Sequence, residues 1–254
     1  MIEIRRYVLE LFGLQSEIKD ELGFRINQGS KISKIGYATN LTPQTLLSAG
    51  ELGVDLLVTH HDAWDFVYGM KEACEKKLAE LGISHLFAHL PLDAADFGTN
   101  ESLVTKLGAR TVKKICLENG LYCGRVAEFE TQIPLAQLVA SVEKTCEEKV
   151  SSWNNRKTGI RRIGVVSGGG TPTRYARECA ENGCDVYITG EKSLYLIEYA
   201  AFIGMDLVVG SHTFTELPGT ESFAKKIGGR FGLETICVPE EHTEACGFPS
   251  GDNT

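Results

Sequence analysis

The feature that most constrains the fold is a strand–helix–strand pattern that occurs twice along the chain. In the first copy, residues 34–39 form a strand and Thr42-Pro43 starts a helix, with threonine as the N-cap and proline at the first helical position. Gly53 ends this helix, and the apolar run 54–59, rich in branched residues, forms the next strand. Strands that alternate with helices predict an α/β fold with a largely parallel sheet.

The second copy repeats these signals in the same order: a strand at 161–167, a helix start at Thr171-Pro172, a stop at Gly183 and a strand at 185–189. In this alignment Gly190-Glu191 takes the place of His60-His61. We interpret the repeat as an internal duplication; the alternative is that all strand–helix–strand units resemble one another. The duplication predicts two similar α/β halves, residues 1–125 and 126–254, with intertwining allowed.

Further elements follow from hydrophobic periodicity and from glycine and proline positions. Predicted helices cover 2–14, 71–81, 101–107, 134–146 and 194–203, and predicted strands cover 83–88, 124–130 and 206–209. Residues 17–28 are expected to form an irregular connection.

Composition excludes several classes of protein. The 254 residues are 43% hydrophobic and 24% charged, which fits one large or two small globular domains. A net charge of −8 argues against direct nucleic-acid binding. We find no signal peptide and no apolar run long enough to span a membrane. The eight cysteines include no CxxC pair, which favours free thiols and a cytoplasmic location.

Histidines and acids follow three of the predicted strands. The strand 54–59 leads into His60-His61, and the strand 83–88 leads into His89, with Asp93 four residues later. The strand 206–209 is followed by His212, with Glu216 again four residues later. Because open α/β sheets bind ligands at the carboxyl ends of their strands, we expect these side chains to form a metal site.

The donor types suit two divalent ions per subunit. Imidazole binds zinc, iron and cobalt, carboxylates also accept manganese, and a carboxylate can bridge two ions. A single histidine at a strand end is more often a capped or surface residue, but three such strand ends favour metal. His85 lies inside a strand and is expected to be packed or hydrogen-bonded, and His242 is expected to be solvated.

Three further features have two interpretations each. Glu191 either supports the site as an orienting group or general base, or complements a helix dipole. The loop Gly168-Gly169-Gly170 either binds phosphate at a helix N-terminus or is a plain turn, which we favour because it lacks the P-loop lysine. The aromatic residues Trp64, Phe66 and Tyr68 either line a ring-stacking pocket or pack the loop.

These motifs resemble those of the Nif-three-like family, often named GTP cyclohydrolase 1 type 2. The resemblance runs from about Gly36 to Pro239 and rests on four motifs: Val58–His61, His89–Ala94, Asp185–Glu191 and His212–Glu216. It implies two α/β parts packed about a central dinuclear metal site, in a toroidal homohexamer. The implied metal ligands are His60, His61, Asp93, His212 and Glu216, with His89 at or beside the site.

The resemblance also implies roles and has departures. Glu216 is the implied bridging acid, and Asp93, Glu191 and His89 are candidates for catalytic proton transfer. Many members have proline where this chain has Asp62, and polar residues where it has Leu90-Pro91. The linker at 147–160 is too short for the extra domain that some relatives have between the halves.

Two functions compete. The first is a dinuclear metal-dependent hydrolase of the GTP cyclohydrolase type, which acts on a nucleotide-like small molecule or other heterocycle and releases formate from guanine. The second is a non-enzymatic, metal-binding regulatory or scaffold protein. A purely structural metal fits less well, because structural zinc sites usually have four ligands, often cysteines.

Overall fold

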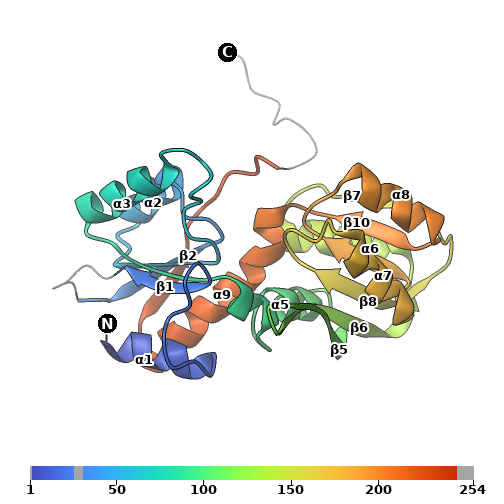
Figure 1. The fold of residues 1–254 in the computed structure, drawn as a ribbon, viewed down its shortest axis with the longest axis horizontal. Coiled ribbons are helices and arrows are strands. Elements are labelled where there is room, and N and C mark those ends of the chain that lie inside the picture. Colours follow the sequence, from blue (N-terminus) through green and yellow to red (C-terminus); the bar gives the residue numbers. More distant parts are fainter. Residues whose placement is uncertain (1, 26–30, 245–254) are drawn as a thin grey trace, which may run out of the picture. The chain divides into compact units, whose positions relative to one another are not determined.

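The computed structural model describes residues 2–25 and 31–244, and the chain divides into two compact units. The first unit comprises residues 1–98 and 219–241, and the second comprises residues 99–218 and 242–254. Each has its own sheet (Figure 1). The prediction of an α/β fold is confirmed.

The first unit contains a five-stranded sheet in the order β1-β4-β3-β2-β11. Its strands are β1 (Leu22–Arg25), β2 (Lys34–Ala38), β3 (Leu56–Thr59), β4 (Ser84–Ala88) and β11 (Glu234–Cys237). Its helices are α1 (Ile2–Leu11), α2 (Pro43–Glu51), α3 (Met70–Leu81), α4 (Leu90–Ala94) and the second part of α9 (His212–Phe231). Every neighbouring pair is parallel except β1–β4.

Helices cover both faces of this sheet. Leu46 of α2 and Leu78 of α3 pack with Leu57 of β3 in one apolar cluster. On the other side, the ring of Phe12 lies 5.3 Å from that of Phe223 in α9. All four residues of β3 are buried, as expected for a central parallel strand between two helical layers.

The second unit contains a six-stranded sheet in the order β5-β6-β8-β9-β10-β7. Its strands are β5 (Arg110–Glu118), β6 (Leu121–Ile133), β7 (Ser151–Trp153), β8 (Ile160–Val166), β9 (Val186–Thr189) and β10 (Asp206–Val209). Its helices are α5 (Thr99–Lys106), α6 (Leu135–Cys146), α7 (Thr173–Glu181), α8 (Leu194–Phe202) and the start of α9. Strands β8, β9 and β10 are parallel, and the others pair antiparallel.

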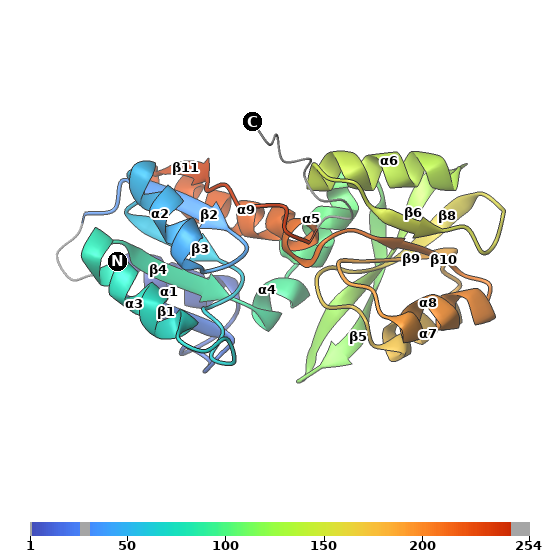
Figure 2. The ribbon, with the colours of Figure 1, turned by 90° about the horizontal axis from the view of Figure 1, so that it is seen from above.

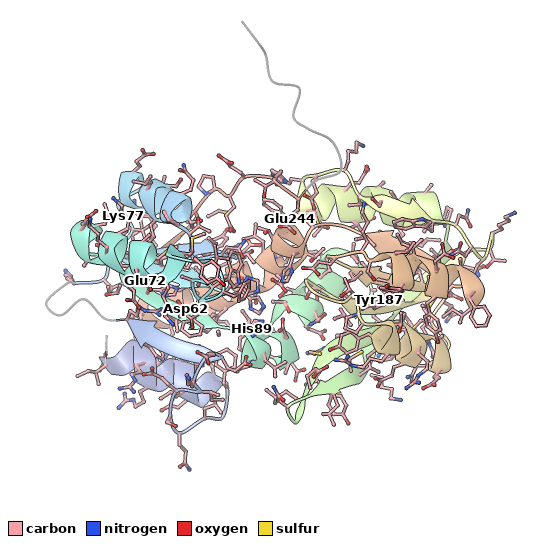
Figure 3. All side chains as sticks on the ribbon, turned by 45° about the horizontal axis from the view of Figure 1, so that its top comes forward. Asp62, Glu72, Lys77, His89, Tyr187 and Glu244 are labelled. Atoms are coloured by element: carbon pink, nitrogen blue, oxygen red, sulfur yellow. The ribbon has the colours of Figure 1, made fainter. Side chains whose placement is uncertain are left out.

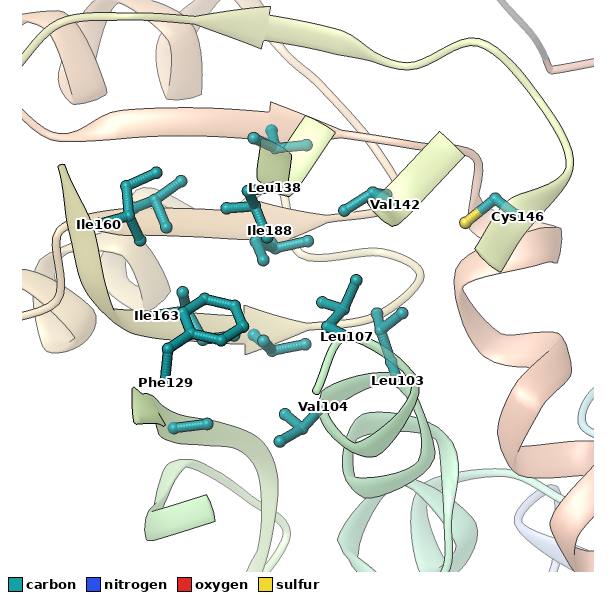
Figure 4. Packing of buried hydrophobic residues seen from close by; sticks show 14 of the residues in the cluster. Leu103, Val104, Leu107, Phe129, Leu138, Val142, Cys146, Ile160, Ile163 and Ile188 are labelled. Atoms are coloured by element: carbon teal, nitrogen blue, oxygen red, sulfur yellow. The ribbon is translucent and has the colours of Figure 1, made fainter. Parts of the chain in front are cut away.

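The side chains of β9 alternate between two helical layers. Val186 and Ile188 point into the cluster that Leu103 of α5 and Leu138 of α6 complete (Figure 4). Tyr187 between them is also fully buried and points to the opposite face. In the second unit, α6 lies on one side of the sheet and α7 and α8 lie on the other (Figure 2).

The predicted repeat is present in both sheets. The succession β2-α2-β3-α3-β4 corresponds to β8-α7-β9-α8-β10, and in each the three strands are parallel neighbours. The glycines that end the helices have positive φ angles, and they are Gly53 and Gly82 in one copy and Gly183 and Gly204 in the other.

Several features differ from the sequence-based expectations, and α4, α9, β7 and β11 are among the elements that were not predicted. The stretch 17–28 was expected to be irregular, but it contains β1. This four-residue segment is a strand because it pairs with β4, and its sequence alone does not indicate a strand. The hairpin partner β5 was not predicted. Because β5 pairs with β6, β6 pairs with β8 and β11 pairs with β2, the units divide at 98/99, 218/219 and 241/242, whereas a boundary at 125/126 was expected.

The seven cysteines in the described part of the chain are free thiols, and Cys246 lies outside it. No helix among the described residues is both long and apolar enough to cross a membrane.

The two Thr-Pro helix starts are not equivalent in structure. Thr42 is the N-cap of α2, and its hydroxyl accepts a 3.0 Å hydrogen bond from the Thr45 backbone N–H. In the second copy Pro172 is the N-cap of α7, without a side-chain capping bond, so Thr171 lies one residue too early to cap.

This difference predicts opposite outcomes for two matched substitutions. Thr42→Ala removes a capping hydrogen bond and should lower the free energy of unfolding by about 1 kcal/mol. Thr171→Ala removes no cap and should change it by only a few tenths of a kcal/mol, roughly as a surface substitution does. Urea unfolding of both variants measures the difference, and equal losses would contradict the assignment.

Candidate metal centre

In the first unit, three histidines gather where β3 and β4 end. These strands are parallel neighbours, so their carboxyl ends lie at the same edge of the sheet. His60 and His61 follow β3 and are buried, and His89 follows β4 with its side chain 43% exposed. One ring nitrogen from each lies within 4.8 Å of the others. Asp93, on α4, places Oδ1 3.4 Å from Nε2 of His60.

Hydrogen bonds fix which ring nitrogen of each histidine is available. His60 Nδ1 lies 2.8 Å from the backbone oxygen of Ala88. A carbonyl oxygen only accepts, so Nδ1 bears the proton and, in the neutral ring, Nε2 bears the lone pair. His89 Nδ1 donates in the same way to Glu21 Oε2, at 3.0 Å.

His61 is oriented by a longer chain of contacts. Its Nδ1 lies 2.7 Å from the side-chain oxygen of Asn40. The amide nitrogen of Asn40 donates to Glu240 Oε1 at 2.9 Å, which fixes the amide so that its oxygen faces His61. The Glu240 carboxylate also accepts from the backbone N–H groups of Thr39 and Asn40. Nδ1 of His61 is therefore a donor, and Nε2 bears the lone pair.

The second unit contains a smaller cluster of donors. His212 is the first residue of α9 and Glu216 lies one turn later, so Nε2 of His212 is 3.2 Å from Glu216 Oε1. His212 Nδ1 donates to Glu191 Oε1 at 2.6 Å. Burial lowers the pKa of His212, but the carboxylates of Glu216 and Glu191 outweigh burial and raise this pKa to about 11. Without a metal, a proton therefore supplies the positive charge between these acids.

In all four histidines Nδ1 donates to a fixed oxygen, so a metal ion would be bound by Nε2. In His212 this nitrogen is protonated beside Glu216 until a metal ion replaces the proton. Metal-binding histidines in proteins are oriented in this way by carbonyl or carboxylate acceptors. The residues of both clusters therefore fit divalent metal ions by donor type and by ring orientation.

The glycine loop before α7 makes room for the donors of the second cluster. A β-carbon on Gly168 would lie 1.7 Å from Glu216 Oε1 and 2.9 Å from His212 Nε2, and the φ angle of Gly168 is +65°. The backbone N–H of Gly168 donates to the Thr215 hydroxyl at 2.9 Å, which ties the loop to α9. These contacts explain the glycine without invoking a phosphate.

The C-terminal segment caps the helix that holds the second cluster. The Glu244 carboxylate accepts from the backbone N–H of His212 at 2.8 Å and of Thr213 at 3.2 Å. His242 is exposed, as expected. Its ring also stacks on Phe214 at 3.9 Å, and its Nδ1 lies 3.2 Å from Glu148 Oε2. A nearby flat ring and a carboxylate hold this histidine, which its polar sequence context did not indicate.

Of the remaining candidates, Trp64 and Glu191 contact histidines of the clusters, and His85 and Tyr68 do not belong to them. His85 is fully buried within β4, as expected. Trp64 tilts against His61, with ring centroids 5.8 Å apart, while Tyr68 is fully exposed. Glu191 precedes the N-cap of α8, Ser193, and its partner is His212.

Sequence analysis missed the residues that orient the histidines, namely Glu21, Asn40 and Glu240. Asn40 had a usable signal, because it lies two residues after β2, as His61 lies two residues after β3. Glu21 and Glu240 are acids in loops distant in sequence from the histidines, and nothing in their local pattern distinguishes them.

The loop geometry predicts that one glycine tolerates a side chain and its neighbour does not. Gly168→Ala forces a left-handed alanine, which costs about 1–2 kcal/mol, and adds a clash with Glu216. In Gly169→Ala the nearest atom is His212 Cε1 at 3.5 Å, an ordinary contact. Thermal unfolding should show a clear loss for the first variant and little change for the second; equal stability would refute this explanation.

Several known proteins are similar to this chain in sequence or in fold. The GTP cyclohydrolase 1 type 2 homolog of Pyrococcus horikoshii is 29% identical over 228 residues, covering 87% of this chain and 89% of that protein. The protein of the same name from Neisseria meningitidis serogroup B is 29% identical over 229 residues, covering 88% and 90%. The solved structure of protein ybgI, described as of unknown function, matches with a TM-score of 0.81 at 23% identity and covers 94% of this chain and 98% of its own.

The family model for Duf34/NIF3 (NGG1p interacting factor 3) matches residues 3–244, a span that includes both donor clusters and the acids that orient them. The resemblance to the Nif-three-like family is therefore confirmed, and this chain belongs to the Duf34/NIF3 family.

Proposed function

We propose that the chain is a dinuclear metal-dependent hydrolase. The observation that supports this most directly is the uniform presentation of Nε2 by His60, His61, His89 and His212. Metal-binding histidines usually donate their other ring N–H to a carboxylate or a carbonyl oxygen, and these four follow that pattern.

The proposed ligands are His60, His61, Asp93, His212 and Glu216, with His89 as a further ligand. Glu216 is our candidate for the bridging acid, because its side chain is only 4% exposed and a buried carboxylate needs a cation nearby. Nitrogen and carboxylate donors are compatible with zinc, iron, manganese or cobalt.

The side chains suggest a division of labour. Divalent ions supply Lewis acidity and a nucleophilic water at neutral pH. His89 and Asp93 are partly exposed and so can exchange protons with a substrate. Glu191 instead accepts from His212, which lowers the pKa of Glu191 and keeps its carboxylate ionised. We therefore assign Glu191 to orienting His212, and proton transfer to whichever of His89 and Asp93 does not bind a metal ion.

The proposed substrate is a nucleotide or a related heterocycle, and the proposed reaction is hydrolytic ring opening. Support comes from the relatives that are named GTP cyclohydrolase 1 type 2 homolog. The competing function is a non-enzymatic metal-binding protein, which has the same ligands and no turnover.

The test has two parts. The purified protein should contain about two divalent ions per chain, as a dinuclear hydrolytic centre does. Incubated with GTP and a panel of nucleotides, it should release formate or phosphate. A full metal complement without turnover on the panel would favour the non-enzymatic function.

Two variants make the metal measurement specific. Glu216→Gln keeps the shape of the side chain but removes its charge, and it should lose bound metal and activity together. Glu72→Gln makes the same chemical change on the exposed face of α3 and should leave both unchanged. Unchanged metal content in Glu216→Gln would show that the ligand set is wrong.

We also propose that the chain assembles as a homohexamer. The outer face of α8 supports self-association, because Leu194, Tyr195 and Phe202 are 66%, 78% and 85% exposed and apolar patches of this kind usually mark interfaces. Light scattering should give a particle of six chains. A monomer at micromolar concentration would exclude the hexamer.

A further inference from the structure

Asp62, the residue after the double histidine, is held by a two-pronged ion pair. Its two carboxylate oxygens accept from both terminal nitrogens of Arg25, at 2.5 Å and 2.7 Å. The side chains are only 19% and 28% exposed, so water screens the pair weakly. Asp62 is labelled in Figure 3. Bidentate pairs of this kind fix geometry as well as charge.

Arg25 also starts a second chain of contacts. Its Nη1 lies 3.3 Å from His85 Nδ1, which is opposite Arg25 in the β1–β4 ladder. His85 Nε2 lies 2.8 Å from the Thr59 hydroxyl, and that hydroxyl donates to the backbone oxygen of His61 at 2.6 Å.

The direction of this chain is fully determined. Arginine has only donors, so Nδ1 of His85 must accept and Nε2 must bear the proton. The Thr59 hydroxyl donates its one hydrogen to the backbone oxygen of His61, so its oxygen accepts from Nε2 of His85. Burial lowers the pKa of His85 to about 3, which agrees with a neutral ring in this single tautomer.

Both routes from Arg25 therefore end on the turn that holds the metal donors. One reaches the side chain of Asp62, and the other reaches the backbone carbonyl of His61. The backbone N–H groups of His60 and His61 both bond to Thr39, so the turn is held from the β2 side as well.

We propose that Arg25 is a positioning residue, which fixes the His60–His61 turn through Asp62 and through His85 and Thr59. This inference rests on the proposed metal centre for its functional consequence. It assigns a role to four residues outside the ligand set, and in particular to Asp62.

The test uses one disruptive variant, one conservative variant and one matched control. Arg25→Met removes both routes while keeping the aliphatic stem. Arg25→Lys keeps the charge but not the fork. Glu75→Gln removes the remaining partner of Arg25, Glu75 Oε1 at 3.5 Å from Nε, without touching either route.

The first readout is zinc affinity, measured by competition with a chelator. Arg25→Met should bind zinc about 10- to 100-fold more weakly, the usual effect of removing groups that orient metal ligands. Arg25→Lys should fall in between, and Glu75→Gln should match the wild type. Wild-type affinity in Arg25→Met, with both proteins folded by circular dichroism, would overturn the proposal.

The second readout needs no metal. Nitrogen NMR of the wild-type protein should show His85 protonated at Nε2 and not at Nδ1, and Arg25→Met should shift the ring signals of His60 and His61. The opposite tautomer, or unshifted signals, would overturn the positioning role. If the wild type binds no metal, the proposed function fails, and these NMR signals alone then decide the role of Arg25.

Discussion

The hydrogen bonds at Nδ1 are the interactions on which the candidate site depends. A histidine can coordinate a metal through either nitrogen, and an unconstrained ring samples several rotamers, so ordering it costs entropy. In this chain a carbonyl, an amide and two carboxylates each remove that freedom before any metal binds. The acceptors lie on different elements from the histidines, so the packing of each unit sets the donor geometry. The fold therefore does more than bring imidazoles together, because it selects the same nitrogen in every one.

Preparing the donors imposes requirements on residues with no chemistry of their own. Gly168 has to lack a side chain because Glu216 fills the space beside it, and the Asn40 amide has to face one way because Glu240 holds its nitrogen. Removing one partner from such a network is costly, because the buried donor or acceptor that remains has lost its hydration and gains no hydrogen bond in return. The requirement therefore extends from the histidines and acids of the clusters to the glycine, the amide and the acids that surround them.

The strand ends and the histidines were predictable from the sequence, whereas the residues that orient the histidines were not. Periodicity, Thr42-Pro43 and the helix-ending glycines located the repeat, because these signals act within a few residues. Strand β1 was not predicted, because its four residues form a strand only by pairing with β4, which is distant in sequence. Glu21 and Glu240 were not predicted for the same reason. Each is a loop acid that reaches its partner, His89 or Asn40, only in the folded chain. Thr171 shows a further limit: its motif matches Thr42, but the helix begins one residue later.

The structure also explains why the two copies of the repeat contribute different donors. Gly190 occupies the place of His60, and a β-carbon there would lie 2.7 Å from the Ser211 backbone oxygen and 2.8 Å from the His212 α-carbon. The start of α9 approaches the end of β9 so closely that only glycine fits, and a histidine at 190 is sterically excluded. The same approach brings His212 against Glu191, in the position that aligns with His61. In the second copy, the strand end therefore has no histidine. It supplies the Glu191 carboxylate, which orients the imidazole of His212 on α9. A duplicated framework with unlike donors follows from this single close contact.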